Sequence, residues 1–267
     1  MTNWFYKILI AGSVLFAPAI SSASDAADEI EKGKYLTALS GCVTCHTAAA
    51  PSSVPFAGGH ELKTPFGTFY TPNITPDMVT GIGAWTNFQF LRALKAGIRP
   101  DGSHYFPSFP YTSYANMTDE DALLIFGYLK SLEPVSYAVS DHDIAPPFSW
   151  RWLQAGWKFL FFDAESDPSL ADKSAEIQRG AYLVNALGHC GECHSPRNDL
   201  GGVDTSQAFA GNTADSALGR VPNITPDTET GIGDWSAGDF REFFKSGMKP
   251  NFDDVQGEMA AVINHGT

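Results

Sequence analysis

Apolar residues recur at helical spacing in several separate stretches of this chain. Gly33 lies in the first stretch and would let the helix that Thr118 opens cross it closely, because glycine has no side chain. The helical spacing of the apolar residues predicts an all-α fold. The pattern predicts helices near residues 28–40, 86–97, 118–131, 175–187 and 236–247.

Polar residues mark where two of these helices begin. Thr86 and Ser236 suit the N-cap position, and Gln89 and Asp239 follow at the third helical position, where a capping box needs an acceptor. Gly97 is expected to end the helix that Thr86 begins. The start and stop signals therefore agree with the apolar spacing.

Two long stretches rich in glycine and proline, 51–84 and 196–234, are predicted to be loops. Loops of this length need a large apolar surface to pack against. Between them, residues 148–162 are rich in Trp and Phe and predict an aromatic helix. That helix would join two domains, or it would form a docking surface for another subunit.

Two segments of the chain recur further along it. Residues 72–77 reappear at 222–227, and residues 80–85 reappear at 230–235, so that Asn223 follows Asn73 by 150 positions. Two copies of one unit indicate two similar domains rather than a solenoid. The second would lack a counterpart of the helix at 118–131. The predicted parts are a signal peptide at 1–23, a first domain at 24–133, a linker at 134–172 and a second domain at 173–267.

The first residues have the features of a secretory signal. Lys7 precedes an apolar run at 8–20, and small residues follow, with cleavage expected near Ala23. An uncleaved anchor is the alternative, but Gly12 and Pro18 interrupt the run. We expect an exported protein in the periplasm, or one held peripherally on the outer face of the inner membrane through its partners.

The net charge of the chain limits the classes of partner that it can bind. Its 267 residues carry a formal net charge of −13, with a pI near 4.8. Nucleic-acid binding needs a basic surface, and anionic lipid headgroups would be repelled. A protein partner with a basic patch remains compatible with this charge.

All four cysteines fall in two C-x-x-C-H motifs, at residues 42–46 and 190–194. This is the attachment signature of haem c. Two cysteines three positions apart present both thiols to one edge of a porphyrin, and the following His46 or His194 can bind the iron. We predict two covalently bound haem c groups, held by Cys42, Cys45, His46, Cys190, Cys193 and His194.

Three other uses of the cysteines compete with this prediction. A structural disulfide would suit an exported protein but would not need the histidines. Zinc would require Cys₂His₂ or Cys₄ ligation. A thioredoxin-like site would require a βαβ pattern, which the sequence does not show.

The second axial ligand decides what each iron can do, and a Met thioether suits electron transfer. For the second haem we predict Met259, which we place in a loop after the helix at 236–247. The duplication sets Phe109 opposite Met259, so the first haem would take Met117 instead, since a flexible thioether adapts to the shift. His104 and an open iron remain alternatives.

Two further pairs of repeated residues each have two possible roles. Trp85 and Trp235 would donate indole N–H bonds to haem propionates or pack in the core. Asn73 and Asn223 are expected to organise turns, with contact to the haem edge a lesser alternative.

Together these motifs resemble the cytochrome c subunits of bacterial membrane-bound alcohol and sugar dehydrogenases. The similarity covers roughly residues 28–267, although most members carry three haems and this chain resembles the first two units. At position 109 this chain has Phe, where the alcohol dehydrogenase members of the family have Met. The motifs that carry the resemblance are G-x-Y-L at 33–36, P-F-G-T at 65–68, D-G-S-H at 101–104, F-P-Y at 109–111, A-G-W at 155–157 and R-G-A-Y-L-V at 179–184.

The resemblance implies two tandem class I-like cytochrome c domains joined by the aromatic helix. It implies that the chain accepts electrons from a periplasmic dehydrogenase, which oxidises alcohols, sugars or aldehydes. The chain would pass these electrons on to quinone, another cytochrome or an oxidase. The alternative is a dihaem enzyme, thiosulfate dehydrogenase-like or peroxidase-like, with an open or unusually ligated first iron.

Overall fold

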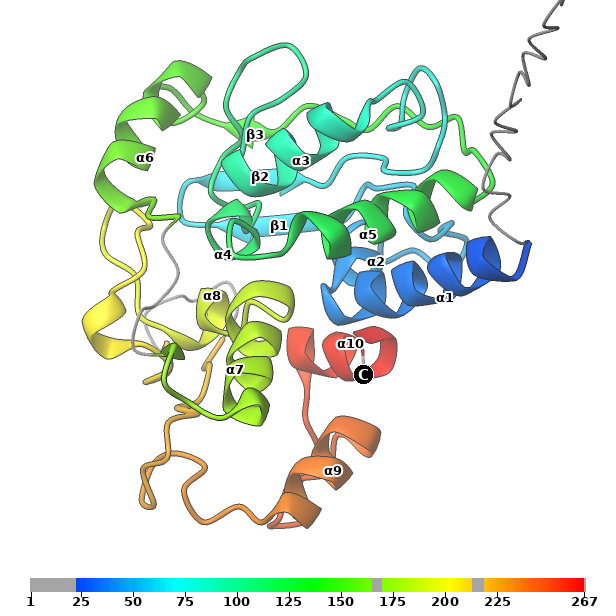
Figure 1. Ribbon diagram of the computed structural model, residues 1–267. Coiled ribbons are helices and arrows are strands. Elements are labelled where there is room, and N and C mark those ends of the chain that lie inside the picture. Colours follow the sequence, from blue (N-terminus) through cyan, green and yellow to red (C-terminus); the bar gives the residue numbers. More distant parts are fainter. Residues whose placement is uncertain (1–22, 165–169, 213–218, 267) are drawn as a thin grey trace, which may run out of the picture.

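The computed structural model describes residues 23–164, 170–212 and 219–266. The predicted signal peptide at 1–23 therefore lies almost entirely outside the described residues. Figure 1 shows a mainly helical protein with one small sheet, which agrees with the predicted helical class. The first half contains α1 (Ala23–Leu39), α2 (Cys42–Cys45), β1 (Glu61–Thr64), β2 (Gly67–Tyr70), α3 (Asn87–Ala96), α4 (Tyr111–Tyr114), α5 (Asp119–Ser131) and β3 (Asp143–Ile144).

The second half is also mainly helical in the described residues. A 3₁₀ turn (Arg151–Leu153) runs into α6 (Gln154–Phe161), and α7 (Ala175–Tyr182) continues through a π-helical segment (Leu183–Leu187). The remaining elements are α8 (Gly191–His194), a 3₁₀ turn (Thr205–Gln207), α9 (Ala237–Ser246) and α10 (Gly257–Gly266).

Helices α1 and α5 cross closely at Gly33, as predicted (Figure 1). A Cβ at Gly33 would stand 2.9 Å from the Cβ of Tyr128 and would clash with the carbonyl oxygen of Leu124. Helix α3 joins the same core, where Phe90 stacks on Phe126 with ring centroids 4.5 Å apart. The main hydrophobic core therefore lies among α1, α3 and α5. Its buried members are Leu36, Phe56, Ile82, Phe90, Leu94, Tyr114, Met117, Ala122, Ile125, Phe126, Leu129 and Leu187.

The predicted caps are confirmed. The hydroxyl of Thr86 accepts from the Gln89 backbone and the Gln89 side chain bonds back, which completes a capping box at α3. Ser236 and Asp239 form the same box at α9. Helix α3 ends at Gly97, whose φ of +59° favours glycine.

The stretch 51–84 is not the pure loop that we expected. It contains β1 and β2, which pair antiparallel with Thr64 opposite Gly67, and β2 pairs in turn with β3. A Cβ at Gly67 would collide with the carbonyl oxygen of Asp143, so glycine is needed where β3 approaches. The sheet joins residues more than 70 positions apart, and local sequence signals do not report such pairing.

The loop that follows each C-x-x-C-H motif is built in the same way in the two halves. The backbone N–H of Gly58 donates to the His46 carbonyl at 2.8 Å, and Gly211 donates to the His194 carbonyl at 2.8 Å. The sequence duplication is therefore matched by repeated backbone hydrogen bonds. The domain boundaries stay a prediction.

Helix α6 contacts segments on both sides of it in the sequence. Trp157 meets the ring of Tyr111 edge-on at 6.4 Å and donates its indole N–H to the carbonyl of Leu200. The α-helix of the aromatic stretch begins at Gln154, several residues later than predicted. Its role as a linker stays a prediction.

The chain after α9 differs from our expectation. Met259 lies in helix α10 and not in a loop. Figure 1 shows α10 (red) beside α1 (blue), and it packs against α1, α2 and α9. A helix therefore runs back from the second half onto the first C-x-x-C-H motif.

Candidate haem-attachment sites

The first C-x-x-C-H motif forms a single helical turn between Gly41 and His46. Gly41 has a φ of +62°, which turns the chain sharply before Cys42. The turn places Cys42 against the main hydrophobic core, while Cys45 lies at its outer side. Cys42 and Cys45 thus leave the same turn, the arrangement that two thioether bonds to one porphyrin require.

The imidazole of His46 is prepared to bind a metal through one nitrogen. Its Nδ1 lies 2.7 Å from the carbonyl oxygen of Pro72. A carbonyl only accepts, so Nδ1 carries the proton and the lone pair is on Nε2. Burial lowers the pKa of His46 to about 4, against the opposing effect of the bond to Pro72, so the ring is neutral near pH 7.

The second motif repeats this arrangement. The Nδ1 atom of His194 lies 2.8 Å from the carbonyl oxygen of Pro222, and burial lowers the pKa of His194. Pro72 and Pro222 are the corresponding first residues of the repeated P-N-I-T-P-D segments. A carbonyl that orients a ligating histidine is a recurrent feature of metal sites.

The four thiols are free and protonated at neutral pH. Burial raises the pKa of Cys42 to about 12 and that of Cys190. Cys45 and Cys193 are exposed as residues, but neighbouring protein atoms crowd their sulfurs and raise the pKa of each thiol to about 11. These raised pKa values mean that none of the four thiols is activated as a nucleophile in the folded chain.

The donor set fits haem c. Each motif offers two unpaired thiols on one turn and a neutral imidazole with a free Nε2, as thioether attachment and axial ligation require. Within the described residues no group of three or more His, Cys, Asp and Glu side chains is arranged to hold a metal ion by itself.

Met117, the predicted second ligand of the first haem, is buried in the main hydrophobic core. It is 1% exposed and belongs to the hydrophobic cluster against which Cys42 and Phe109 pack. His104 lies beside Lys158, whose charge adds to the effect of burial in lowering the pKa of His104. Its Nδ1 is buried without a hydrogen-bond partner. Ligation by Met117 or His104 stays a prediction.

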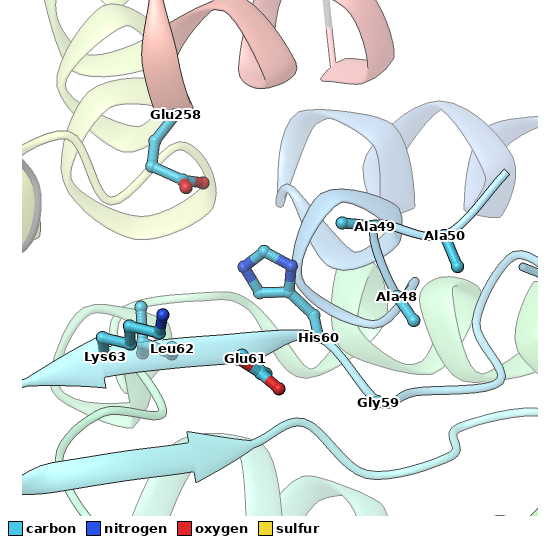
Figure 2. Close-up of a pocket in the computed structure, with 9 residues that line it drawn as sticks. All are labelled: Ala48, Ala49, Ala50, Gly59, His60, Glu61, Leu62, Lys63 and Glu258. Atoms are coloured by element: carbon cyan, nitrogen blue, oxygen red, sulfur yellow. The ribbon is translucent and has the colours of Figure 1, made fainter.

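Met259 lies in the first turn of α10, next to Glu258. Helix α10 begins beside a cavity of about 510 Å³ next to the first motif. In Figure 2, Glu258 of α10 and His60 of the 48–63 segment point toward one another across this cavity. The charge of Glu258 also contributes to the raised pKa values of both Cys45 and Cys193. Met259 is therefore carried by a helix that contacts the first motif, and its pairing with His194 stays a prediction.

The repeated Trp and Asn residues are packed mainly by protein. Trp85 contacts the main hydrophobic core, and the ring of Trp235 lies 5.4 Å from that of Phe240. Asn73 organises its turn as expected, accepting from the backbone N–H of Thr75 at 2.9 Å. Bonds from the indoles to haem propionates stay a prediction.

Sequence reasoning missed several residues around the motifs. Thr47 and Ser195, directly after the histidines, accept from the backbone N–H of Phe56 and Phe209, which both have a positive φ. The repeated F-A-G at 56–58 and 209–211 was the available signal. Glu192 was also missed, because its partners lie 79 and 80 positions away.

Comparison with known proteins identifies the family. The cytochrome c family model matches residues 30–133. A diheme cytochrome c-type protein of Cereibacter sphaeroides is 43% identical over 268 residues, covering 98% of this chain and 86% of the relative. The chain belongs to the c-type cytochrome family. Membership gives this cytochrome the cytochrome c fold, covalent haem c and a function in electron transfer.

Two further relatives are named as dehydrogenase subunits. The cytochrome c subunit of an alcohol dehydrogenase (quinone) from Gluconobacter oxydans is 39% identical, over 90% of this chain and 52% of its own length. The gluconate 2-dehydrogenase cytochrome c subunit of Pantoea cypripedii is 35% identical, over 96% of this chain and 59% of its own length. This cytochrome thus spans little more than half of those two subunits. In the part of the chain that the structure describes, no helix is long and apolar enough to cross a membrane.

Proposed function

We propose that this cytochrome carries two haem c groups and transfers electrons from a periplasmic dehydrogenase to quinone, another cytochrome or an oxidase. The observation that carries the proposal is the repeated site. Each half combines a C-x-x-C-H turn with free thiols and a neutral histidine whose Nδ1 is bonded to a proline carbonyl. Haem c, when bound, supplies an iron that gains and loses single electrons.

The residues of the chain have separate roles in this proposal. Cys42 and Cys45 attach one porphyrin, and Cys190 and Cys193 attach the other. His46 and His194 bind the two irons through Nε2, while their Nδ1 atoms are held by backbone carbonyls. We further propose Met117 as the second ligand of the first iron and Met259 as that of the second.

The relatives support the kind of partner. Three of them are named as cytochrome subunits of alcohol, gluconate and fructose dehydrogenases. We therefore propose a partner that oxidises an alcohol, an aldehyde or a sugar-derived substrate, and export to the periplasm through the segment at 1–23. Membrane association would come through the partners. The thiosulfate dehydrogenase-like and peroxidase-like alternatives gain no support from these names.

The haem count tests the proposal. The chain is expressed in a host that matures c-type cytochromes, together with two double variants, Cys42→Ala/Cys45→Ala and Cys190→Ala/Cys193→Ala. We expect two covalent haems per chain in the wild type and one in each variant, measured by pyridine haemochrome absorbance against protein concentration. A wild type with one haem, or with none, would show that the proposal is wrong.

The axial ligands are tested separately. Replacement of Met117 or Met259 by Ala should remove a thioether–iron absorption band near the red end of the ferric spectrum. Each single variant should lose the band of one haem only. Retention of both bands in either variant would reject that methionine as a ligand without affecting the haem count.

A further inference from the structure

Glu192 connects the second C-x-x-C-H motif to the first half of the chain. It is the second variable residue of that motif, and its side chain is only 12% exposed. Its Oε1 accepts from the hydroxyl of Thr112 at 2.6 Å and from the hydroxyl of Ser113 at 3.0 Å. Both hydroxyls belong to α4, so one carboxylate fastens the second motif to a helix of the first half.

Arg197 makes this buried carboxylate possible. Its guanidinium donates to the Glu192 Oε2 at 2.5 Å and to the Glu192 carbonyl at 2.8 Å. A second nitrogen donates to the carbonyl of Gly201 at 2.7 Å, which fixes the position of the guanidinium. A buried charge that is paired and fully hydrogen-bonded holds its geometry, whereas removal of one partner is strongly destabilising.

A second set of contacts joins the segments that precede the two motifs. The ring of His189, directly before Cys190, meets Tyr114 edge-on at 5.5 Å. The hydroxyl of Tyr114 donates to the carbonyl of Ser40 at 2.7 Å, just ahead of Cys42. The Nε2 of His189 also lies 3.7 Å from where a Cβ would stand at Gly41. The segments that precede the two motifs are therefore in contact.

The two attachment sites are close to each other. Glu192 of the second motif is bonded to Thr112 of α4, and the Nε2 of His189 lies against Gly41, directly before Cys42. The corresponding position in the first motif is Thr44, whose hydroxyl is buried without a hydrogen-bond partner. The connection between the motifs is thus made from the second motif, through Glu192.

We propose that Glu192 is a positioning residue, which holds the second attachment motif on Thr112 and Ser113 of α4 and thereby sets the distance and orientation between the two haems. This inference rests on the proposed function with two haems. In the exchange that it supports, one electron leaves the reduced centre, which becomes ferric, and enters the oxidised centre, which becomes ferrous. Glu192 takes no electron, and its contribution is geometric.

A purely local role is the competing explanation, because Glu192 and Arg197 also pair within the second half. The double variant Thr112→Val/Ser113→Ala separates the two explanations. It removes the donors on α4 and leaves the pair with Arg197 in place. The matched control is Thr112→Ser/Ser113→Thr, which retains both hydroxyls.

The test measures haem geometry directly by circular dichroism of the Soret band. Two haems fixed near each other give a bisignate couplet whose size depends on their separation and angle. We expect the couplet to be lost in Thr112→Val/Ser113→Ala and in Glu192→Gln, and to be kept in the hydroxyl swap and in Thr44→Val. After pulse reduction, electron transfer between the haems should slow by about tenfold in Thr112→Val/Ser113→Ala and in Glu192→Gln. The rate of this transfer depends steeply on the placement of the two haems.

Haem content distinguishes the ways in which this test can fail. If the variants keep two haems, the wild-type couplet and the wild-type transfer rate, Glu192 does not position the haems and the proposal is overturned. If the wild type itself contains a single haem, the proposed function fails, and this inference fails with it. Loss of the couplet in the hydroxyl swap as well would also overturn it, because the effect would not depend on the hydroxyls.

Discussion

At the scale of single residues, the two halves surround the same asparagine differently. The Asn73 amide donates to the carbonyl of Val135 at 2.7 Å and to the hydroxyl of Thr80 at 3.1 Å, and the residue is 3% exposed. In the described part of the chain, the Asn223 amide repeats only the second bond, to Thr230 at 2.9 Å. Among the described residues, Asn73 therefore holds a distant segment in place, while the Asn223 amide bonds within its own turn.

This difference predicts unequal costs for the same substitution. Asn73→Ala removes the amide that donates to the Val135 carbonyl and the nearer acceptor of the Thr75 hydroxyl, and should lower the free energy of unfolding by about 1–3 kcal/mol. Asn223→Ala should cost less, because its site is more open to water. Denaturant unfolding of both variants measures the difference, and equal costs would contradict the role given to the Val135 contact.

Lys158 gives a pH prediction. Burial lowers its pKa from 10.5 to about 8, although its ammonium donates to the carbonyl of Gly97 at 2.8 Å. The folded chain then binds this proton less tightly than the unfolded chain does. Between about pH 8 and 10.5 the unfolded state holds more protons, so the contribution of Lys158 to the free energy of unfolding rises with pH.

The measurement compares the wild type with Lys158→Gln across this pH range by denaturant unfolding. The difference in stability between the two should change in favour of the wild type as the pH rises. Lys32→Gln, which removes one positive charge from an exposed position, provides the matched control. A pH-independent difference for Lys158→Gln would contradict the lowered pKa.

At the scale of elements, the two halves provide a matched pair of helical glycines. Gly33 of α1 and Gly180 of α7 begin corresponding G-x-Y-L and G-A-Y-L segments. A Cβ at Gly33 would stand 2.9 Å from the Cβ of Tyr128 in α5, whereas a Cβ at Gly180 would meet nothing within 4 Å. The same substitution should therefore have opposite effects.

Gly33→Ala should destabilise the protein by about 1–3 kcal/mol, because α1 and α5 must move apart. Gly180→Ala should stabilise it by roughly 0.5–1 kcal/mol, because alanine loses less backbone freedom in a helix. Thermal unfolding of the two variants beside the wild type decides between these signs. A stabilised Gly33→Ala would mean that the helices do not cross at this residue.

The elements also show why only part of this structure was predictable. The caps at Thr86 and Ser236 and the turns at residues 42–46 and 190–194 are local patterns, and the sequence carries their geometry directly. The sheet is not local, since β3 pairs with a strand that ends more than 70 residues earlier. Helix α10 differs from the loop expected around Met259 because it begins at a glycine, Gly257, and because its packing is against α1 and α2.

The candidate sites divide in the same way. The attachment cysteines and His46 follow from spacing alone, but the carbonyl that orients His46 belongs to Pro72, 26 positions away. Glu192 lies inside a recognised motif, yet its contacts with Thr112 and Ser113 emerge only when α4 and α8 come together. Chemistry set by adjacent residues was predictable, and chemistry set by the tertiary arrangement was not.

At the scale of the whole molecule, charge governs how the cytochrome meets its redox partners. The formal net charge of −13 makes the protein a polyanion at neutral pH. Such a field attracts cationic reagents and repels anionic ones, and salt weakens both effects because the screening length falls to about 10 Å at 0.1 M ionic strength. The salt dependence of electron transfer should therefore reverse sign with the charge of the reagent.

Stopped-flow oxidation of the reduced cytochrome tests this directly. With a cationic oxidant such as a cobalt tris-phenanthroline complex, we expect the second-order rate to fall as salt increases, because attraction is lost. With ferricyanide, an anion, the rate should rise over the same range, because repulsion is lost. The two reagents serve as controls for each other, since a general effect of salt on the protein would move both rates in one direction. The reverse pattern, with salt raising the rate for the cationic oxidant and lowering it for ferricyanide, would show that electrons leave through a local basic surface, where the net charge of the molecule does not dominate.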